Sequence, residues 1–295
     1  MLAAEEFVDL THWSPAEDEP AGENEKTWFL APDGSRWIFK RNRPQRSPNE
    51  HASELVASKV ARLLGVPAAE IRLATIAGEI GCISRDVKSN PRHQLDSGSL
   101  FIAEYAQDFD PRAKDSAGHS LENIANVFTR VAPPIGYNEP DLTSAGWFAG
   151  YLIFDALIGN QDRHSENWSL ELDLAGAFHL APSYDHATSL GIVQRNPDKV
   201  NKLLRSPEAL QTFVQRARGT RFEAKAKTTL VQVGAEFCRI AAPPAAVHWG
   251  NRVAALDLNE VADIVASSGM SAPNDKFAIE IVRRNKERLV TCLLS

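Results

Sequence analysis

Short apolar runs around one amphipathic helix dominate the first 85 residues. Two of these runs flank Ala31-Pro32-Asp33-Gly34, and a Pro-Asp-Gly turn between apolar runs is typical of a β-hairpin. Apolar residues then recur at helical spacing until Gly65 ends the pattern. Strands are predicted over 26–30, 36–40, 71–76 and 80–84, and the helix over 50–64. The order β-β-α-β-β indicates a small sheet with one helix.

Beyond residue 86 the apolar spacing becomes mainly helical, and one short strand is predicted over 177–180. Helices are predicted over 121–131, 144–158, 207–216, 224–241, 258–267 and 276–294. We therefore expect an α+β chain of two lobes. A β-rich N-lobe spans 1–86 and a larger helical C-lobe spans 87–295. This is the arrangement of a protein-kinase-like fold.

Composition changes this picture little. The chain has 295 residues, 43% of them hydrophobic, and its net charge of −6 gives no overall preference for nucleic acid or anionic membranes. The three cysteines (Cys82, Cys238, Cys292) have no metal-ligand spacing and read as reduced thiols. The N-terminus lacks a secretion-signal pattern, and the apolar stretch 147–158 is too short to span a bilayer. We expect a cytoplasmic protein without a transmembrane segment.

The polar loop Ile158-Gly159-Asn160-Gln161-Asp162-Arg163-His164-Ser165-Glu166-Asn167 follows a strong helix. Phosphoryl transfer needs a carboxylate near the attacking hydroxyl and an oxygen ligand for Mg²⁺. Asp162 and Asn167 provide one at each end of the loop. Because these residue types are common in turns, the loop alone decides nothing.

A second carboxylate, Asp185, ends the segment Leu180-Ala181-Pro182-Ser183-Tyr184-Asp185. The segment follows the predicted strand 177–180. We therefore expect the two loops on neighbouring strands of a hairpin, with Asp185 opposite Asn167 as a second metal ligand. The two loops together favour phosphoryl transfer over a pair of ordinary turns.

These loops resemble those of the HipA-like bacterial serine/threonine kinases. The family pattern Asn-x-Asp-x-His-x-x-Asn is matched by Asn160, Asp162, His164 and Asn167, and its Pro-x-Tyr-Asp pattern by Pro182, Tyr184 and Asp185. The first loop is also similar to that of phosphatidylinositol kinases, a distant branch of the same fold. The Pro-x-Tyr-Asp form favours the HipA-like side.

The resemblance implies roles for these residues. Asp162 would be the catalytic base, Asn167 and Asp185 would hold Mg²⁺, and ATP would be the phosphoryl donor. His164 would belong to the catalytic loop mainly as a hydrogen-bonding brace. A protein substrate is expected, and an antitoxin partner is known for toxin–antitoxin members of the family.

ATP also requires a cation for its phosphates and a carboxylate to hold that cation. Lys40 ends the second strand of the hairpin. Its partner is Glu54 on the following helix or, one helical turn earlier, Glu50. The spacing of the family favours Glu54.

The remaining nucleotide contacts rest on weaker patterns. Gly22 to Thr27 resembles the phosphate-binding loop of the family, which would assign Gly22 and Lys26 to ATP. Ala21 stands where some members carry an autophosphorylated serine. The strand and hinge that end with Ser84 and Asp86 are expected to contact adenine.

The segment after Asp185 is rich in basic residues, and it is either a solvated face or the border of a substrate cleft that attracts acidic groups. The basic residues are Arg195, Lys199, Lys202, Arg205, Arg216, Arg218, Arg221, Lys225 and Lys227. Three functions therefore remain open: a HipA-like protein kinase, a kinase for a small molecule or inositol lipid, and a binding module without activity. The intact Lys40, Asp162 and Asp185 argue against the last.

Overall fold

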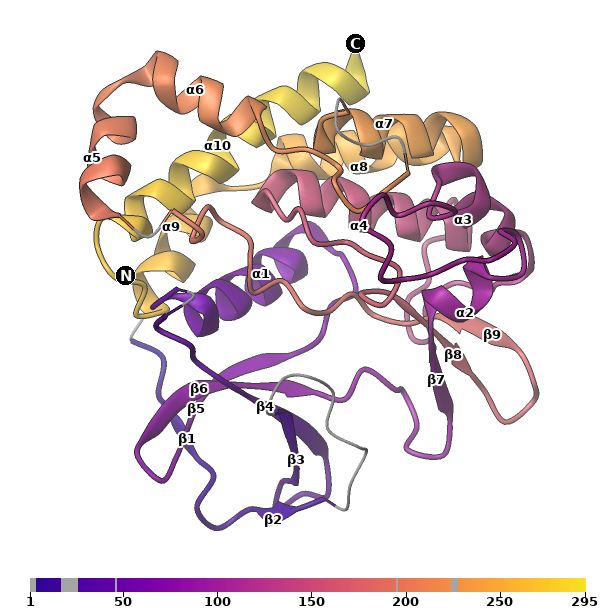
Figure 1. Cartoon of the computed structure of the whole chain (residues 1–295), viewed down its shortest axis with the longest axis horizontal. Helices are drawn as coiled ribbons and strands as arrows, with labels where there is room; N and C mark the ends of the chain where they lie inside the picture. The colour runs from indigo at the N-terminus through magenta and orange to yellow at the C-terminus, as the bar shows by residue number, and fades with distance from the viewer. Residues whose placement is uncertain (1–3, 17–25, 46, 195, 224–227) are drawn as a thin grey trace.

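The computed structural model describes residues 4–16, 26–45, 47–194, 196–223 and 228–295. A six-stranded sheet lies at one end of the molecule and a layer of helices at the other (Figure 1). The sheet has the order β1-β5-β6-β4-β3-β2, and all neighbouring strands are antiparallel except β1 and β5. Its strands are β1 (Val8–Asp9), β2 (Ser14–Pro15), β3 (Lys26–Leu30), β4 (Arg36–Arg41), β5 (Ile71–Ile76) and β6 (Glu79–Arg85).

Helix α1 (Glu50–Leu64) lies between this sheet and the C-terminal helices (Figure 1). Leu55 packs against Leu73 and Cys82 of the sheet. Val56, Val60 and Leu64 belong instead to the large hydrophobic core of the C-terminal region, together with residues of helix α4. Because α1 is buried on two sides, it fixes the position of the sheet relative to the helices.

The C-terminal region surrounds helix α4 (Ser144–Ile158), every residue of which is buried. Its N-terminus is capped by the Thr143 hydroxyl, which accepts a hydrogen bond from Gly146 N, and it ends at Gly159 with φ +69°. The other helices are α2 (Gly98–Ile102), α3 (Leu121–Val127), α5 (Pro197–Arg205), α6 (Pro207–Gln215), α7 (Leu230–Ala241), α8 (Pro243–Ala255), α9 (Leu258–Ser267) and α10 (Asn274–Leu294).

A small antiparallel sheet of order β7-β8-β9 lies beside α2 (Figure 1). Its strands are β7 (Gln94–Ser97), β8 (Ser169–Leu172) and β9 (Phe178–Leu180). Strands β8 and β9 form a hairpin in which Leu170 pairs with Leu180. The expected hairpin between the two polar loops is confirmed, because one loop precedes β8 and the other follows β9.

The β-β-α-β-β order and the kinase-like α+β fold are confirmed. The helix predicted over 224–241 begins only at Leu230, where Thr229 and Gln232 form a capping box; residues 224–227 lie outside the described residues. The helix predicted over 121–131 ends at Val127 and continues as a 3₁₀ turn. The lobe boundary after residue 86 stays a prediction. No helix in the described ranges has the length and apolarity that a membrane span requires.

Candidate active site

Lys40, near the end of β4, joins three parts of the molecule. Its Nζ lies 2.5 Å from Glu54 Oε1 on α1 and 2.9 Å from Asp185 Oδ1 after β9. Glu50, the other candidate partner, instead accepts a hydrogen bond from Arg43 Nε at 3.4 Å. The partner of Lys40 is therefore Glu54, as the spacing of the family predicted.

The charges of this cluster balance one another in a mostly buried setting. Burial lowers the pKa of Lys40, but the carboxylates of Asp185 and Glu54 outweigh burial and raise it above its usual value. Burial raises the pKa of Glu54, which is only 1% exposed, and the charge of Lys40 opposes that rise. Lys40 is therefore a permanent cation held at the junction of β4, α1 and the β9 loop.

Helix α1 is also bound directly to the segment that follows Asp185. Glu54 Oε2 accepts a hydrogen bond from the backbone N–H of His186 at 3.0 Å. One residue earlier, the Ser53 hydroxyl donates to Ser189 O at 3.3 Å. Glu54 thus holds the lysine with one oxygen and the loop with the other.

Asp185 has a left-handed backbone with φ +63°, a conformation that Asp tolerates better than most residues. Its side chain is 32% exposed. The preceding Tyr184 donates its hydroxyl to Glu166 O at 3.0 Å and pairs with Ser169 Oγ at 2.6 Å. Burial raises the pKa of Tyr184 to about 12. Tyr184 therefore fastens the Asp185 loop to the end of the catalytic loop.

Hydrogen bonds within the loop give the catalytic loop its shape. Asn160 donates to Asp155 Oδ1 at 2.8 Å, and its own Oδ1 accepts from Asp162 N at 3.3 Å. At the other end, Asn167 Nδ2 donates to Asp162 O at 2.7 Å. Both asparagines of the motif therefore fix the backbone around Asp162.

His164 lies half-buried in this loop. Its Nδ1 accepts a hydrogen bond from the backbone N–H of Glu166 at 3.2 Å. Burial lowers the pKa of His164, and the charge of Asp162 opposes that change. This geometry is that of a loop brace, and a direct part in the chemistry stays a prediction.

Arg163 and Asp155 form a buried ion pair that the sequence analysis missed. Arg163 Nε donates to Asp155 Oδ2 at 2.7 Å, and Nη2 donates to Asp155 Oδ1 at 2.8 Å. The same guanidinium donates to Asn167 O at 2.5 Å and to Ser183 Oγ at 2.8 Å. It therefore connects α4, the catalytic loop and the Asp185 loop. A charged residue inside the otherwise apolar helix 144–158 was the available signal.

His186 completes this network as a neutral ring. Its Nε2 lies 3.2 Å from Arg163 Nη2 and 2.8 Å from Ser183 Oγ. Because a guanidinium can only donate, Nε2 accepts and the ring carries its hydrogen on Nδ1. Burial and the charge of Arg163 hold the pKa of His186 well below its usual value.

The carboxylate of Asp162 is paired with Arg221, which comes from the segment between α6 and α7. Arg221 Nε and Nη2 both lie 2.7 Å from Asp162 Oδ1. The segment is bound to the catalytic loop again where Arg218 N donates to Gln161 Oε1 at 3.0 Å. The side chains of Asp162 and Arg221 are 31% and 50% exposed, so the pair faces solvent.

A buried histidine fixes the backbone of Arg221. His119 Nε2 accepts from the indole N–H of Trp168 at 3.2 Å, so the hydrogen of the neutral ring is on Nδ1. That nitrogen donates to Arg221 O at 2.6 Å, and the ring stacks on Phe222 at 5.1 Å. Because Trp168 directly follows Asn167, these contacts fix the backbone of Arg221 relative to the catalytic loop.

The remaining predicted residues lie apart from these contacts. Ser84 is buried in β6, where it pairs with Ile38 and Ile71 of the two flanking strands. Asp86 N donates to Arg36 O at 2.9 Å, so the backbone N–H of Asp86 already has a hydrogen-bond partner. The Asp86 carboxylate accepts from Lys88 N at 3.1 Å. The side chain of Lys26 and all of Gly22 lie outside the described residues. The nucleotide roles of these four stay predictions.

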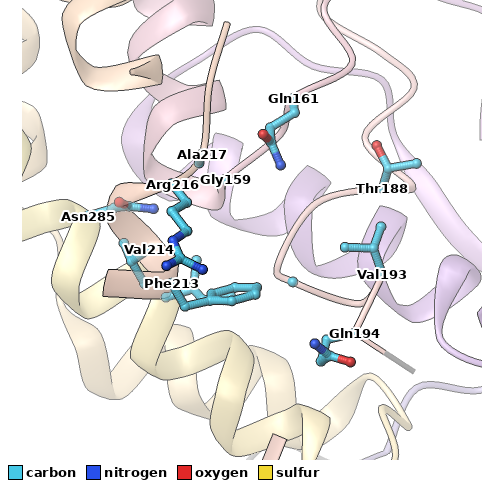
Figure 2. A pocket seen from close by; sticks show the side chains of 12 residues that line it. Gly159, Gln161, Thr188, Val193, Gln194, Phe213, Val214, Arg216, Ala217 and Asn285 are labelled. Atoms are coloured by element: carbon cyan, nitrogen blue, oxygen red, sulfur yellow. The ribbon is translucent and has the colours of Figure 1, made fainter. Parts of the chain in front are cut away.

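A pocket of about 360 Å³ lies beside the catalytic loop (Figure 2). Gly159 and Gln161 contribute one wall, and Gln161 directly precedes Asp162. The other lining residues come from the segment after the Asp185 loop, from the end of α6 and from α10; they are Thr188, Gly191, Val193, Gln194, Phe213, Val214, Arg216, Ala217, Ile281 and Asn285.

A comparison with known protein families shows which family this chain belongs to. The model of the HipA-like C-terminal domain matches residues 19–254. The chain belongs to the HipA-like family. The protein Y4dM of Sinorhizobium fredii, whose name describes it as a candidate kinase, is 25% identical over 172 residues. That alignment covers 55% of this chain and 39% of Y4dM, so the chain spans well under half of this relative's length.

Solved structures share the fold of this HipA-like chain. The Helicobacter pylori proinflammatory kinase CtkA is similar with a TM-score of 0.76 and 17% identity, over 98% of this chain and 97% of CtkA. HipA of Shewanella oneidensis, solved with HipB and operator DNA, is similar with a TM-score of 0.55 and 12% identity, over 98% of this chain and 72% of HipA. These likenesses show a protein-kinase-like fold.

Proposed function

We propose that this chain is an ATP- and Mg²⁺-dependent kinase that phosphorylates serine or threonine hydroxyls of a protein. The contact of Lys40 with both Glu54 and Asp185 carries the proposal. A kinase needs a cation for the phosphates of ATP next to a carboxylate for the metal. The cluster has both, and it lies where the sheet and the helical region meet.

Lys40 would bind phosphate oxygens of ATP, with Glu54 holding its ammonium in place. The contact between Lys40 and Asp185 would then give way to contacts with the nucleotide and its metal. This exchange is chemically balanced, because a bound triphosphate replaces one negative partner of the lysine by another. Glu54 stays in place because it is also held by His186 N.

The donor set near Asp185 fits Mg²⁺ delivered with a nucleotide. The side-chain Nδ2 of Asn167 donates a hydrogen bond to Asp162 O, which leaves the side-chain oxygen Oδ1 of Asn167 as the proposed ligand atom. Asp185 adds a partly exposed carboxylate. Within the described residues, no group of three or more His, Cys, Asp or Glu side chains gathers as a metal cage. Few protein ligands are usual for Mg²⁺, and a bound ion would supply positive charge that offsets the charge of the phosphates of ATP.

Asp162 would orient the acceptor hydroxyl and accept its proton. Arg221 holds one carboxylate oxygen, Oδ1, and thereby sets the side-chain rotamer. The other oxygen, Oδ2, lies outside this pair and is the atom proposed to face the hydroxyl. The general base therefore needs no other side chain to position it.

A protein substrate is proposed because the pocket and the basic segment 216–221 extend the site beyond the reacting atoms. An antitoxin partner is not part of this proposal, since the likeness to HipA at 12% identity supports the fold alone.

Purified protein incubated with γ-labelled ATP and lysate tests the proposal. Label is expected on serine or threonine of one or a few polypeptides, identified by mass spectrometry, and it should be absent with the Asp162→Asn variant. Label only on a lipid or small molecule would contradict the protein-kinase proposal. An absence of any ATP turnover with Mg²⁺ would contradict the kinase proposal altogether.

A further inference from the structure

The pocket beside Gln161 is positioned to receive a part of the substrate. Gln161 lines the pocket and directly precedes Asp162 in the catalytic loop. Its side chain is held by Arg218 N at 3.0 Å, so this wall is fixed relative to the proposed base. The pocket is therefore lined by the residue that directly precedes the proposed base.

Another wall includes Gly191, which directly follows the buried Leu190. Leu190 and Gly191 both have positive φ, at +57° and +69°. Leu190 is fully buried, and a bulky residue in this conformation stores strain of roughly 1–3 kcal/mol. A Cβ on Gly191 would lie 2.4 Å from Ile281 Cδ1, so only glycine fits against α10. Strain of this kind concentrates at ligand-binding sites.

Apolar and polar side chains line the pocket in equal number, and the exposed Arg216 forms part of its rim. Figure 2 shows Phe213, Val214 and Arg216 on one side, facing Thr188 and Val193 on the other. Val193 is 58% exposed, so the apolar surface continues out of the pocket. Its volume of about 360 Å³ is at the low end of ligand pockets and suits one or two side chains.

Positive charge surrounds this rim. Arg216 lines the pocket, and Arg218 and Arg221 follow within the same short segment. Arg288 on α10 donates to Val214 O at 3.3 Å, so a further guanidinium contacts a residue that lines the pocket. A ligand with a negative charge beside an apolar group complements this surface.

We propose that the pocket binds an apolar side chain of the polypeptide substrate and that Arg216 binds a carboxylate on a neighbouring residue of that substrate. This inference rests on the proposed function and gives its substrate class. Successive residues of an extended chain advance by about 3.3 Å, so a residue a few positions from the acceptor reaches the pocket. The exposed Val193 supplies contact for the rest of the chain.

A positional-scanning library of serine and threonine peptides with γ-labelled ATP tests this inference. The parent protein should favour an aliphatic or aromatic residue at one fixed position from the acceptor, next to an acidic residue. Ala217→Trp fills the pocket and should raise KM for the best peptide by about tenfold or more.

Two further variants separate binding from folding. Val193→Asp places a negative charge on an exposed residue, so it should fold normally and still raise KM for the peptide. Arg216→Glu should abolish the preference for an acidic residue while the apolar preference persists. Arg112→Glu, the same charge reversal in an exposed loop, is the matched control and should leave both preferences as in the parent.

The inference is overturned if the parent shows no apolar preference, or if Ala217→Trp and Val193→Asp both keep the KM of the parent. ATP hydrolysis without any peptide labelling also overturns it while the kinase proposal stands. If the parent protein hydrolyses no ATP at all, the proposed function fails, and this inference fails with it.

Discussion

Arg221 Nε donates a hydrogen bond to Asp162 Oδ1 at 2.7 Å, and Nη2 lies 2.7 Å from the same oxygen, from a position 59 residues further along the chain. The cation comes from a segment outside the loop that carries Asp162, and His119 donates a hydrogen bond to Arg221 O and so holds that segment in place. Arg221 and Asp162 can be replaced separately, and each replacement has its own expected result.

Replacing Arg221 by alanine should lower kcat while KM for ATP stays within a few-fold of the parent. This ion pair faces solvent, where such a pair contributes about 0.5–1 kcal/mol, so the expected loss in kcat is roughly two- to fivefold. Arg221→Lys should restore part of it, because lysine keeps the charge without the paired donors. Steady-state kinetics at saturating substrate give both constants.

The control for Arg221 is Arg239→Ala. Arg239 also donates Nε and Nη2 to a carboxylate, that of Glu236, at 2.9 and 2.6 Å on the exposed face of α7. It should leave kcat unchanged, since an exposed ion pair contributes little to stability. Equal kinetics in Arg221→Ala and the parent would mean that the pair plays no part in turnover.

Asp162→Asn and Asp185→Asn should separate chemistry from nucleotide binding. The Asp162 variant should keep Mg·ATP affinity within a few-fold and lose turnover by roughly 10²–10⁴, the usual contribution of a positioned general base. The Asp185 variant should lose affinity and turnover together. Calorimetry beside phosphoryl-transfer rates makes the comparison. Parallel loss of ATP binding in both variants would refute the division of roles.

Lys40→Ala should weaken ATP binding and also destabilise the fold. It leaves Glu54, 1% exposed, without its cation, and breaking a buried pair on one side costs about 3–5 kcal/mol. The double variant Lys40→Met, Glu54→Gln should recover most of this free energy of unfolding but no ATP binding. Urea unfolding and ATP titration measure the two effects. A single variant that binds ATP like the parent would exclude Lys40 from the site.

Stability should fall as the pH drops below about 6.5, and His186 should carry part of the effect. Burial and the charge of Arg163 hold its pKa well below its usual value, so in acid the unfolded chain binds a proton that the folded chain does not. The contribution is complete above the unfolded pKa and is lost as pH falls from there toward the folded pKa. One such group changes the free energy of unfolding by at most about 1.4 kcal/mol per pH unit.

His186→Gln keeps an acceptor for Arg163 and removes the titration. Urea unfolding between pH 5 and 8 should therefore show a shallower decline than in the parent. Some decline should remain, because burial also lowers the pKa values of His51, His164 and His248. An unchanged slope would mean that His186 is already exposed to protons in the folded state.

Local patterns were enough to predict the longer strands of the first sheet and several helices. Helices 50–64, 144–158 and 258–267 were predicted at their observed bounds because a glycine stop, a side-chain cap or both coincide with the ends of the apolar period. Helix α8 was missed because Pro243-Pro244 was not read as a helix start, although proline is favoured in the first turn. Strand β7 was missed because its paired residues on β8 lie 72 to 78 positions further along the chain.

Some residues of the candidate site could also be predicted from local patterns, and others could not. Asp162, Asn167 and Asp185 follow a short spaced pattern, and Lys40 and Glu54 follow the strand and helix that carry them. Arg221 has no such pattern: it is one basic residue among nine, and only tertiary packing on His119 selects it. Arg163 occupies a variable position of the loop pattern, so its burial with Asp155 could be recognised only in three dimensions.

The position of α1 limits how this molecule could be switched on and off. Kinases that move the helix carrying the lysine's partner use that movement as a control. Here such a movement would expose Val56, Val60 and Leu64, each fully or almost fully buried in the C-terminal core. Exposing a side chain of this size costs about 1.5–3 kcal/mol. An outward swing of α1 would consume much of the stability of a typical domain, so control by access to the catalytic loop is the less costly route.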